Sequence, residues 1–145
     1  MMHSAAAIAQ MLSHATILKL AFARQFSLNP VELLALLMVG TAEGLSIKSL
    51  RKSLAVPASS LTFTIDSLEK KKLVRRQRST ADRRQWLVSL SPKGERVYAE
   101  VLRAEGAAMS PALEKLSEAD RTAFMRMIET IFGTAAPRTG TALAD

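Results

Sequence analysis

Residues 68–94 read LEKKKLVRRQRSTADRRQWLVSLSPKG, and the predicted fold class follows from this stretch. Its first residues, Leu68–Lys71, form the charged end of a predicted helix. The segments Leu73–Arg76 and Gln85–Leu90 then look like two short strands, because aliphatic and aromatic residues dominate them. The polar segment Gln77–Arg84 between them predicts a hairpin connection. The pair Ser91–Pro92 is typical of the start of another helix.

Positive charge is concentrated in the same stretch. Eight basic residues and one acid, Asp82, lie between Lys70 and Arg84, and the rest of the chain holds twelve residues of each sign. The net charge of +7 therefore lies in one short segment. A surplus confined in this way indicates contact with a local anionic surface rather than a generally basic protein.

Four helices are predicted before the hairpin. Apolar residues recur every three or four positions over Ser4–Phe26, which predicts a long amphipathic helix. Asn29 and Glu32 are typical of a capped helix start, and the residues that follow are apolar on most sides. Ser46 can cap a short third helix, and Ala58–Lys71 forms a fourth after a tight turn. Two short helices joined in this way predict a helix-turn-helix.

Two further helices are predicted after the hairpin. The first begins at Pro92 and ends near Ala108, where Ser110–Pro111 interrupts the pattern. The second is opened by Ser117 and an acidic third position. The expected fold class is mainly α with a small β-hairpin wing, a winged helix-turn-helix of about six helices.

The remaining composition narrows the class of protein. With 48% hydrophobic residues the chain can bury a core, and the lack of cysteine excludes disulfides and Cys-based zinc sites. The histidines do not cluster with carboxylates, so no metal and no cofactor is predicted. No phosphate-binding glycine loop or nucleophile motif is present, so an enzyme is not expected. The N-terminus lacks the features of a signal peptide and no segment is long enough to cross a bilayer, which predicts a cytoplasmic protein without a membrane partner.

The outward face of the predicted helix 58–71 carries small hydroxyl residues. Ser59, Ser60 and Thr62 suit contacts to phosphates and base edges. Phe63 on this face either meets a thymine methyl group in the major groove or packs on a neighbouring side chain. Asp66 would repel phosphate, so it either makes a structural polar contact or accepts a hydrogen bond from a cytosine amine.

The sharpest feature of the hairpin is the triplet Asp82, Arg83 and Arg84. An arginine at a hairpin tip can enter a narrow minor groove, where the negative potential is strongest, and Arg83 is expected to do so. Asp82 can hold Arg84 by a bidentate pair and stiffen the tip. The alternative is a solvated charged turn, which the preceding helix-turn-helix pattern disfavours. Phosphate contacts are expected from four further basic residues: Lys70, Arg75, Arg76 and Arg78.

From about Leu28 to Tyr98 the sequence resembles the MarR (multiple antibiotic resistance) family of regulators, and the flanking helices resemble it more loosely. The order and spacing of several segments carry the resemblance. These segments are Leu68–Val74, Asp82–Arg84, Leu87–Gly94 and Leu116–Arg121.

The resemblance implies a sequence-specific transcriptional regulator, expected to be a repressor, that binds palindromic double-stranded DNA as a homodimer. Recognition helices would enter successive major grooves, and wings the flanking minor grooves. Small aromatic or phenolic ligands commonly release such regulators, and the candidate ligand contacts are Met11, His14, Leu18 and Met38. The implied division is an N-terminal dimerisation helix (1–28), a winged helix-turn-helix (29–91), C-terminal dimerisation helices (92–133) and a disordered tail (134–145).

Several positions depart from the family pattern. Lys72 stands where the family usually has glycine, so either the turn is altered or Lys72 adopts a positive φ at a cost on the order of 1 kcal/mol. Phe63 and Ser67 stand where many members carry arginine, and Pro57 replaces the usual hydroxyl cap. The recognition helix is therefore poor in cations, and more of the affinity should rest on the wing.

The same lack of cations leaves a second interpretation open, which is a winged-helix module that docks an acidic protein and reads no DNA. Titration against DNA over a range of salt concentrations separates the two. Only a regulator should bind a particular DNA sequence more tightly than it binds unrelated DNA, to which its binding is weak and salt-sensitive.

Overall fold

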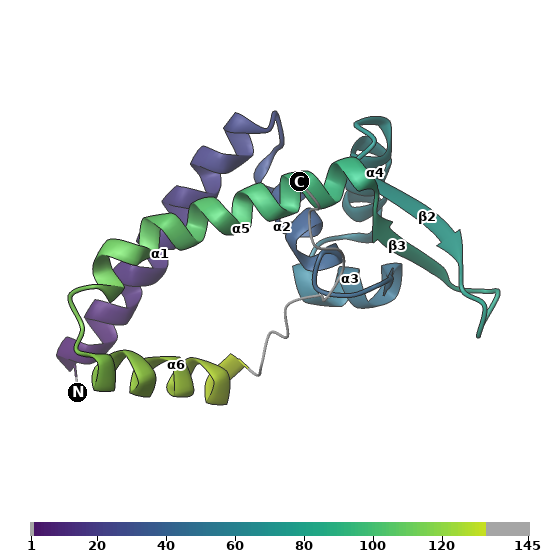
Figure 1. Cartoon of the computed structure of the whole chain (residues 1–145). Coiled ribbons are helices and arrows are strands. Elements are labelled where there is room, and N and C mark those ends of the chain that lie inside the picture. Colours follow the sequence, from purple (N-terminus) through teal and green to yellow (C-terminus); the bar gives the residue numbers. More distant parts are fainter. Residues whose placement is uncertain (1, 133–145) are drawn as a thin grey trace, which may run out of the picture. The chain divides into compact units, whose positions relative to one another are not determined.

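The computed structural model describes residues 2–132, and for residues 2–8, 11, 131 and 132 it describes the backbone alone. The described residues form six helices and a small three-stranded sheet (Figure 1). They divide into two compact units, Met1–Val101 and Leu102–Asp145. The predicted mainly α, winged helix-turn-helix fold is confirmed. The predicted disordered tail, 134–145, lies outside the described residues.

The order of the elements follows the prediction closely. The helices are α1 (Met2–Gln25), α2 (Pro30–Val39), α3 (Ile47–Leu54), α4 (Ala58–Lys70), α5 (Pro92–Leu113) and α6 (Glu118–Phe132). The strands are β1 (Leu45–Ser46), β2 (Val74–Arg78) and β3 (Trp86–Leu90). Of these elements, β1 was not predicted.

The junction of α1 and α2 is fixed by local hydrogen bonds. Ser27 takes a φ of 54°, and the N–H of Leu28 donates to the carbonyl of Ala23 at 2.7 Å, as in a Schellman turn. The predicted capping box then opens α2. The Glu32 N–H donates to Asn29 Oδ1 at 2.9 Å, and the Asn29 N–H donates to Glu32 Oε2 at 2.7 Å.

The core of the first unit positions the fourth helix. The inward face of α4 carries Leu61, Ile65 and Leu68, which are fully buried. It packs on α2, whose Leu33 and Leu36 are also buried. Because one face of α4 is anchored in this way, its opposite face is held at the surface.

The hairpin belongs to a sheet in which β3 lies between β1 and β2, with both pairs antiparallel. Val74 pairs with Leu90 at the buried end of the hairpin, and Arg78 pairs with Trp86 at the exposed end. Leu45 of β1 pairs with the middle of β3. The hairpin is therefore rooted in the core while its tip reaches solvent.

Helix α5 starts where the sequence predicted and ends later. The Gly94 N–H donates to the Ser91 hydroxyl at 3.0 Å, and a Cβ at Gly94 would lie 1.9 Å from the carbonyl oxygen of Leu73. Glycine is required there, because any side chain would push the helix off the strand. The predicted end near Ala108 is wrong, since α5 continues through Pro111 to Leu113. A proline removes only one backbone hydrogen bond of a helix. Because residues 107–112 are exposed, water can donate a hydrogen bond to the carbonyl that is left without a partner.

Lys72 joins α4 to β2 in a left-handed conformation. Its φ is 59°, which confirms the positive φ that was one of two alternatives. Its N–H donates to the carbonyl of Glu69 at 2.8 Å, and the N–H of Leu73 donates to that of Leu68 at 2.9 Å. These two bonds complete a Schellman turn, in which glycine is the preferred residue at the position of Lys72.

We expect the variant Lys72→Gly to raise the free energy of unfolding by about 0.5–1 kcal/mol, because it removes left-handed strain and loses only part of that gain to backbone entropy. Urea unfolding at one fixed protein concentration measures the change. The matched control is Lys70→Gly, which lies within α4 and should destabilise by about 1 kcal/mol. An unchanged or lowered stability in Lys72→Gly would contradict the strain argument.

Candidate nucleic-acid interface

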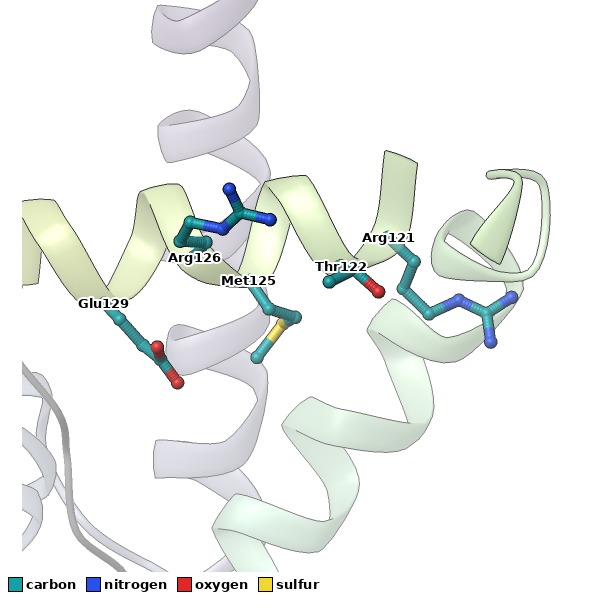
Figure 2. Close-up of a pocket in the computed structure, with 5 residues that line it drawn as sticks. All are labelled: Arg121, Thr122, Met125, Arg126 and Glu129. Atoms are coloured by element: carbon teal, nitrogen blue, oxygen red, sulfur yellow. The ribbon is translucent and has the colours of Figure 1, made fainter. Parts of the chain in front are cut away.

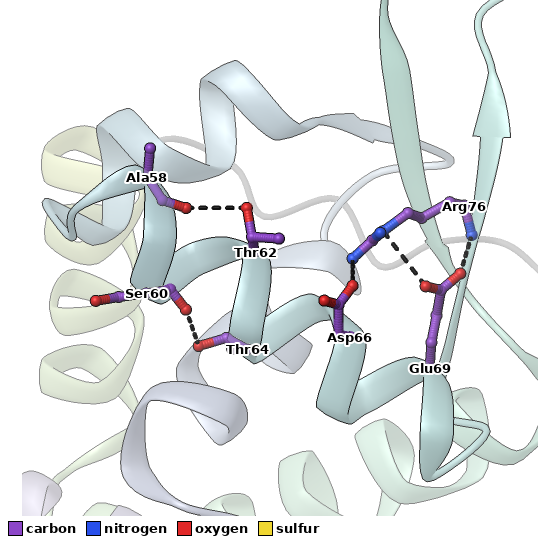
Figure 3. Close-up of polar contacts among 7 residues, drawn as sticks. All are labelled: Ala58, Ser60, Thr62, Thr64, Asp66, Glu69 and Arg76. Carbon is purple, nitrogen blue, oxygen red and sulfur yellow. Dashed lines mark hydrogen bonds and ion pairs between the residues drawn. The ribbon is translucent and has the colours of Figure 1, made fainter.

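The outer face of α4 presents the predicted major-groove residues Ser59, Ser60, Thr62 and Phe63, and all four are exposed. The Thr62 hydroxyl donates to the carbonyl of Ala58 at 3.0 Å, as Figure 3 shows, so its lone pairs remain available to accept a hydrogen bond. Phe63 is 71% exposed, which disfavours the alternative in which it packs on a neighbour. This part of α4 therefore offers hydroxyl groups and one aromatic ring.

The start of α4 has no side-chain cap, as the sequence predicted. Pro57 is the residue at the N-cap, and no side chain there accepts a hydrogen bond from the first turn. The N–H groups of this turn lie beside the exposed Ser59 and Ser60. They are open to water or to other acceptors.

Arg76 of β2 connects the wing to α4. Its guanidinium pairs with the carboxylate of Asp66, and its Nε lies 3.4 Å from Glu69 Oε2 (Figure 3). The backbone N–H of Arg76 also donates to Glu69 Oε1 at 3.2 Å. Asp66 therefore makes the structural polar contact that was one of its two predicted roles. The phosphate contact predicted for Arg76 stays a prediction, and its guanidinium is already engaged by two carboxylates.

A cation–aromatic contact stiffens the hairpin near its tip. The Arg78 guanidinium carbon lies 4.1 Å from the centre of the Trp86 ring. Arg78 Nη1 also donates to the carbonyl oxygen of Arg83 at 3.0 Å. Trp86 thus packs within the hairpin. Both contacts fix the backbone that carries Arg83.

Asp82 organises the turn at the tip. Its Oδ1 accepts from the backbone N–H of Arg84 and its Oδ2 from the side chain of Gln85, each at 3.0 Å. The predicted bidentate pair with the Arg84 guanidinium is not among the ion pairs of the described residues, and Asp82 instead binds the backbone of Arg84. Arg83 and Arg84 are exposed, and Arg83 lines a hollow of about 420 Å³ with Arg78, Ser79 and Thr80.

The buried carboxylate of Glu32 binds one basic residue of the segment, Lys71. The sequence indicated Glu32 only as part of a helix cap. Lys71 Nζ lies 2.7 Å from Glu32 Oε2 and donates to the carbonyl of Ser27 at 2.8 Å. The side chain of Glu32 is 2% exposed. Burial raises the pKa of Glu32, but hydrogen bonds from Lys71, Ser67 and the Asn29 N–H outweigh it and hold the pKa below its ordinary value.

Six of the eight basic residues in the segment make no ion pair within the described part of the chain. Lys71 and Arg76 are the two that carboxylates hold. The other six are Lys70, Lys72, Arg75, Arg78, Arg83 and Arg84. All six are exposed, so their charge is directed at solvent or at a partner.

The predicted ligand contacts are not assembled into a described cavity. His14 is exposed and its Nδ1 lies 2.8 Å from the carbonyl oxygen of Gln10, while Leu18 and Met38 are half-buried. The side chain of Met11 lies outside the described atoms. The ligand role of these residues stays a prediction.

Two hollows involve other residues. One of about 640 Å³ lies where the start of α2 meets α4, and it is lined by Asn29, Pro30, Val31, Val56, Ser59, Ser60, Phe63 and Thr64. The other, of about 410 Å³, lies on α6, where Figure 2 shows the lining residues Arg121, Thr122, Met125, Arg126 and Glu129. Apart from the amphipathic pattern of the helix, no feature of the sequence indicates the α6 hollow.

One segment of the chain matches a known protein family. Residues 28–86 match the model of the MarR family. This segment of the chain is therefore similar to the MarR family. The matched segment spans α2, the helix-turn-helix and most of the wing. A comparison with curated proteins finds no match.

Solved structures share the fold of this chain. A mutant of MepR from a multidrug-resistant clinical isolate of S. aureus aligns with a TM-score of 0.76 and 18% identity over 87% of this chain and 93% of its own. A MarR transcriptional regulator from Methanosarcina mazei aligns at 0.72 and 18% over 91% and 95%. Streptococcus pneumoniae FabT, solved in complex with DNA, aligns at 0.72 and 18% over 90% and 94%.

The described residues provide neither a membrane-spanning helix nor a cluster of metal ligands. None of the helices they form is long and apolar enough to pass through a bilayer. Nor do they contain a group of three or more histidine, aspartate or glutamate side chains that could hold a metal ion.

Proposed function

We propose that the chain is a sequence-specific repressor that binds a palindromic duplex operator as a homodimer and is released by a small aromatic or phenolic ligand. One observation carries the proposal. The exposed face of α4 and the arginine-rich wing belong to neighbouring elements that Arg76 joins through Asp66 and Glu69. A helix face and a basic hairpin held in this way suit a major groove and the minor groove beside it.

The roles of the residues follow from their contacts. Arg83, which is exposed on a stiffened turn, enters the minor groove. Arg84 is assigned to a phosphate, because Asp82 binds its backbone and leaves its guanidinium exposed. Arg76 braces the wing instead of contacting phosphate. The major groove faces Ser59, Ser60, Thr62 and Phe63, and phosphates face Lys70, Arg75 and Arg78.

The helices that flank residues 29–91 supply the dimer contacts in this proposal. Large apolar side chains are exposed on them, including Ile17 at 64%, Met125 at 46% and Met127 at 55%. Burial of such side chains against a second copy would remove apolar surface from water. Dimerisation also matches a palindromic operator, because two-fold symmetry in the protein is mirrored by the DNA.

Binding measurements over a range of salt concentrations test the proposal. The chain is titrated against duplex fragments that flank its own gene, with unrelated duplex as the reference. We expect at least one fragment to bind about 1,000-fold more tightly than the reference at physiological salt. Equally weak, salt-sensitive affinity for every duplex would contradict specific recognition. It would favour the alternative of a module that docks an acidic protein.

We expect Arg83→Ala to weaken binding to the selected fragment and to flatten the dependence of log Kd on log salt concentration by about one unit for each phosphate interaction that the variant removes. The reason is that the exposed Arg83 guanidinium releases counterions when it meets the DNA. Arg103→Ala, an exposed arginine of α5 outside the basic segment, serves as the control and should bind as the wild type does. An unchanged slope in Arg83→Ala would exclude the wing tip from the interface.

A further inference from the structure

Phe63 is exposed in a position where the fold does not need it. Its exposure of 71% is the highest among the large apolar side chains of the described residues. Leu61, Thr64, Ile65 and Leu68 form the buried face of α4, and Phe63 lies on the opposite face. Because burial of an aromatic ring is favourable, the exposed ring of Phe63 offers apolar surface to a partner from outside the described fold.

The neighbours of Phe63 on α4 carry no free charge. Ser59, Ser60 and Ser67 lie within one helical turn of it, and Asp66 is neutralised by Arg76. The first cation on the helix is Lys70, almost two turns away. A base edge that meets this part of α4 therefore meets a neutral surface with an aromatic ring at its centre.

The chemistry of the major groove limits what can lie against that ring. Every base edge there displays hydrogen-bond donors or acceptors, and the C5-methyl group of thymine is the apolar exception. A donor or acceptor covered by a phenyl ring would lose its water without gaining a partner, which is unfavourable. A C5-methyl group loses nothing by this contact and gains from its burial.

We propose that Phe63 is a specificity-determining residue that reads the C5-methyl group of a pyrimidine in the major groove. The inference rests on the proposed function, in which α4 enters that groove. The ligand chemistry is the methyl group itself, so 5-methylcytosine should satisfy Phe63 as thymine does. This readout needs no arginine on the recognition helix.

Uracil substitution isolates the methyl group, because it removes that group and keeps the base pair. Duplexes that bind the chain are first selected from a randomised pool, and each thymine of the selected site is then replaced singly by uracil. At one thymine of a half-site we expect wild-type affinity to fall about fourfold, the effect of leaving one methyl group unburied. The variant Phe63→Ala should bind the thymine and uracil duplexes equally, whereas Arg83→Ala should keep the fourfold difference.

A methylated duplex tests the same contact in the opposite direction. A cytosine at the sensitive position should bind the wild type more weakly than thymine, and 5-methylcytosine should recover about fourfold of that loss. No recovery is expected for Phe63→Ala, whose fold is retained because the side chain is exposed.

The outcomes separate the two proposals. If selection enriches no sequence, the proposed function fails and this inference fails with it. If a sequence is enriched but no thymine of it is sensitive to uracil in the wild type, the inference alone is overturned. The same holds if Phe63→Ala keeps the uracil sensitivity.

Discussion

Replacing Glu32 with alanine is expected to lower the free energy of unfolding by about 2–4 kcal/mol. The carboxylate of Glu32 is 2% exposed and accepts hydrogen bonds from the Asn29 N–H and from Lys71 Nζ. Its loss leaves a part-buried donor unpaired at the start of α2 and separates Lys71 from its partner. The value lies below that of a fully buried pair because the side chain of Lys71 is 35% exposed and can reach water.

The variant Glu32→Gln isolates the pH dependence of the same site, because the wild-type carboxylate titrates and an amide does not. Because the folded-state pKa of Glu32 is held below its ordinary value of 4.5, the ionised carboxylate stabilises the fold above that pH. This contribution is lost as the pH falls through the folded-state pKa. The stability difference between the wild type and Glu32→Gln should therefore be constant at neutral pH and shrink in acid.

Urea unfolding at a series of pH values measures both effects of Glu32. Glu43→Gln, which alters an exposed carboxylate, is the control and should leave stability nearly unchanged. A difference between the wild type and Glu32→Gln that persists unchanged well below pH 4.5 would mean that the charge of Glu32 does not support the fold.

The parts of the structure that the sequence predicted are those fixed by neighbouring residues. The capping box at Asn29 and the serine caps at Ser46 and Ser117 were predicted correctly, because a cap needs only the next three residues. The positive φ of Lys72 was one of two outcomes expected from the resemblance, which has glycine at this position. A Schellman turn is defined within six residues of chain.

The features that the sequence missed depend on residues far apart in the chain. Strand β1 is two residues long and exists through its pairing with β3, so no local pattern could indicate it. The partner of Glu32 is Lys71, 39 positions away, and a run of lysines does not show which one turns inward. Asp66 was expected to make a polar contact, but only the folded sheet shows that Arg76 is the partner.

Replacing Arg76 with glutamine is expected to weaken operator binding by about 30-fold, or about 2 kcal/mol, with a loss of fold stability on the order of 1 kcal/mol or less. The stability effect is small because Asp66 and Glu69 are 45% and 35% exposed. The binding effect is larger for two reasons. Two carboxylates lose their counter-charge close to the DNA, and the wing loses its connection to α4.

A double-mutant cycle with Arg83 distinguishes bracing from direct contact. If Arg76 braces the wing, Arg83 works only while the wing is held, so Arg83→Ala should weaken binding less in the Arg76→Gln background than in the wild type. The expected coupling is about 1 kcal/mol, as for residues linked through a shared structural element. If Arg76 instead contacts phosphate, the two losses should add, and Arg76→Gln alone should lower the salt slope by about one unit per phosphate interaction.

The carboxylates provide a second comparison within the same cycle. Adding Asp66→Asn and Glu69→Gln to Arg76→Gln removes the repulsion of phosphate but does not restore the connection between β2 and α4. The triple variant should therefore recover part of the affinity, while Arg83→Ala still weakens binding less in it than in the wild type. Full recovery would mean that Arg76 acts only by neutralising Asp66 and Glu69. Partial recovery, together with a reduced effect of Arg83→Ala on affinity, would mean that α4 and the wing bind DNA as one rigid unit whose geometry Arg76 sets.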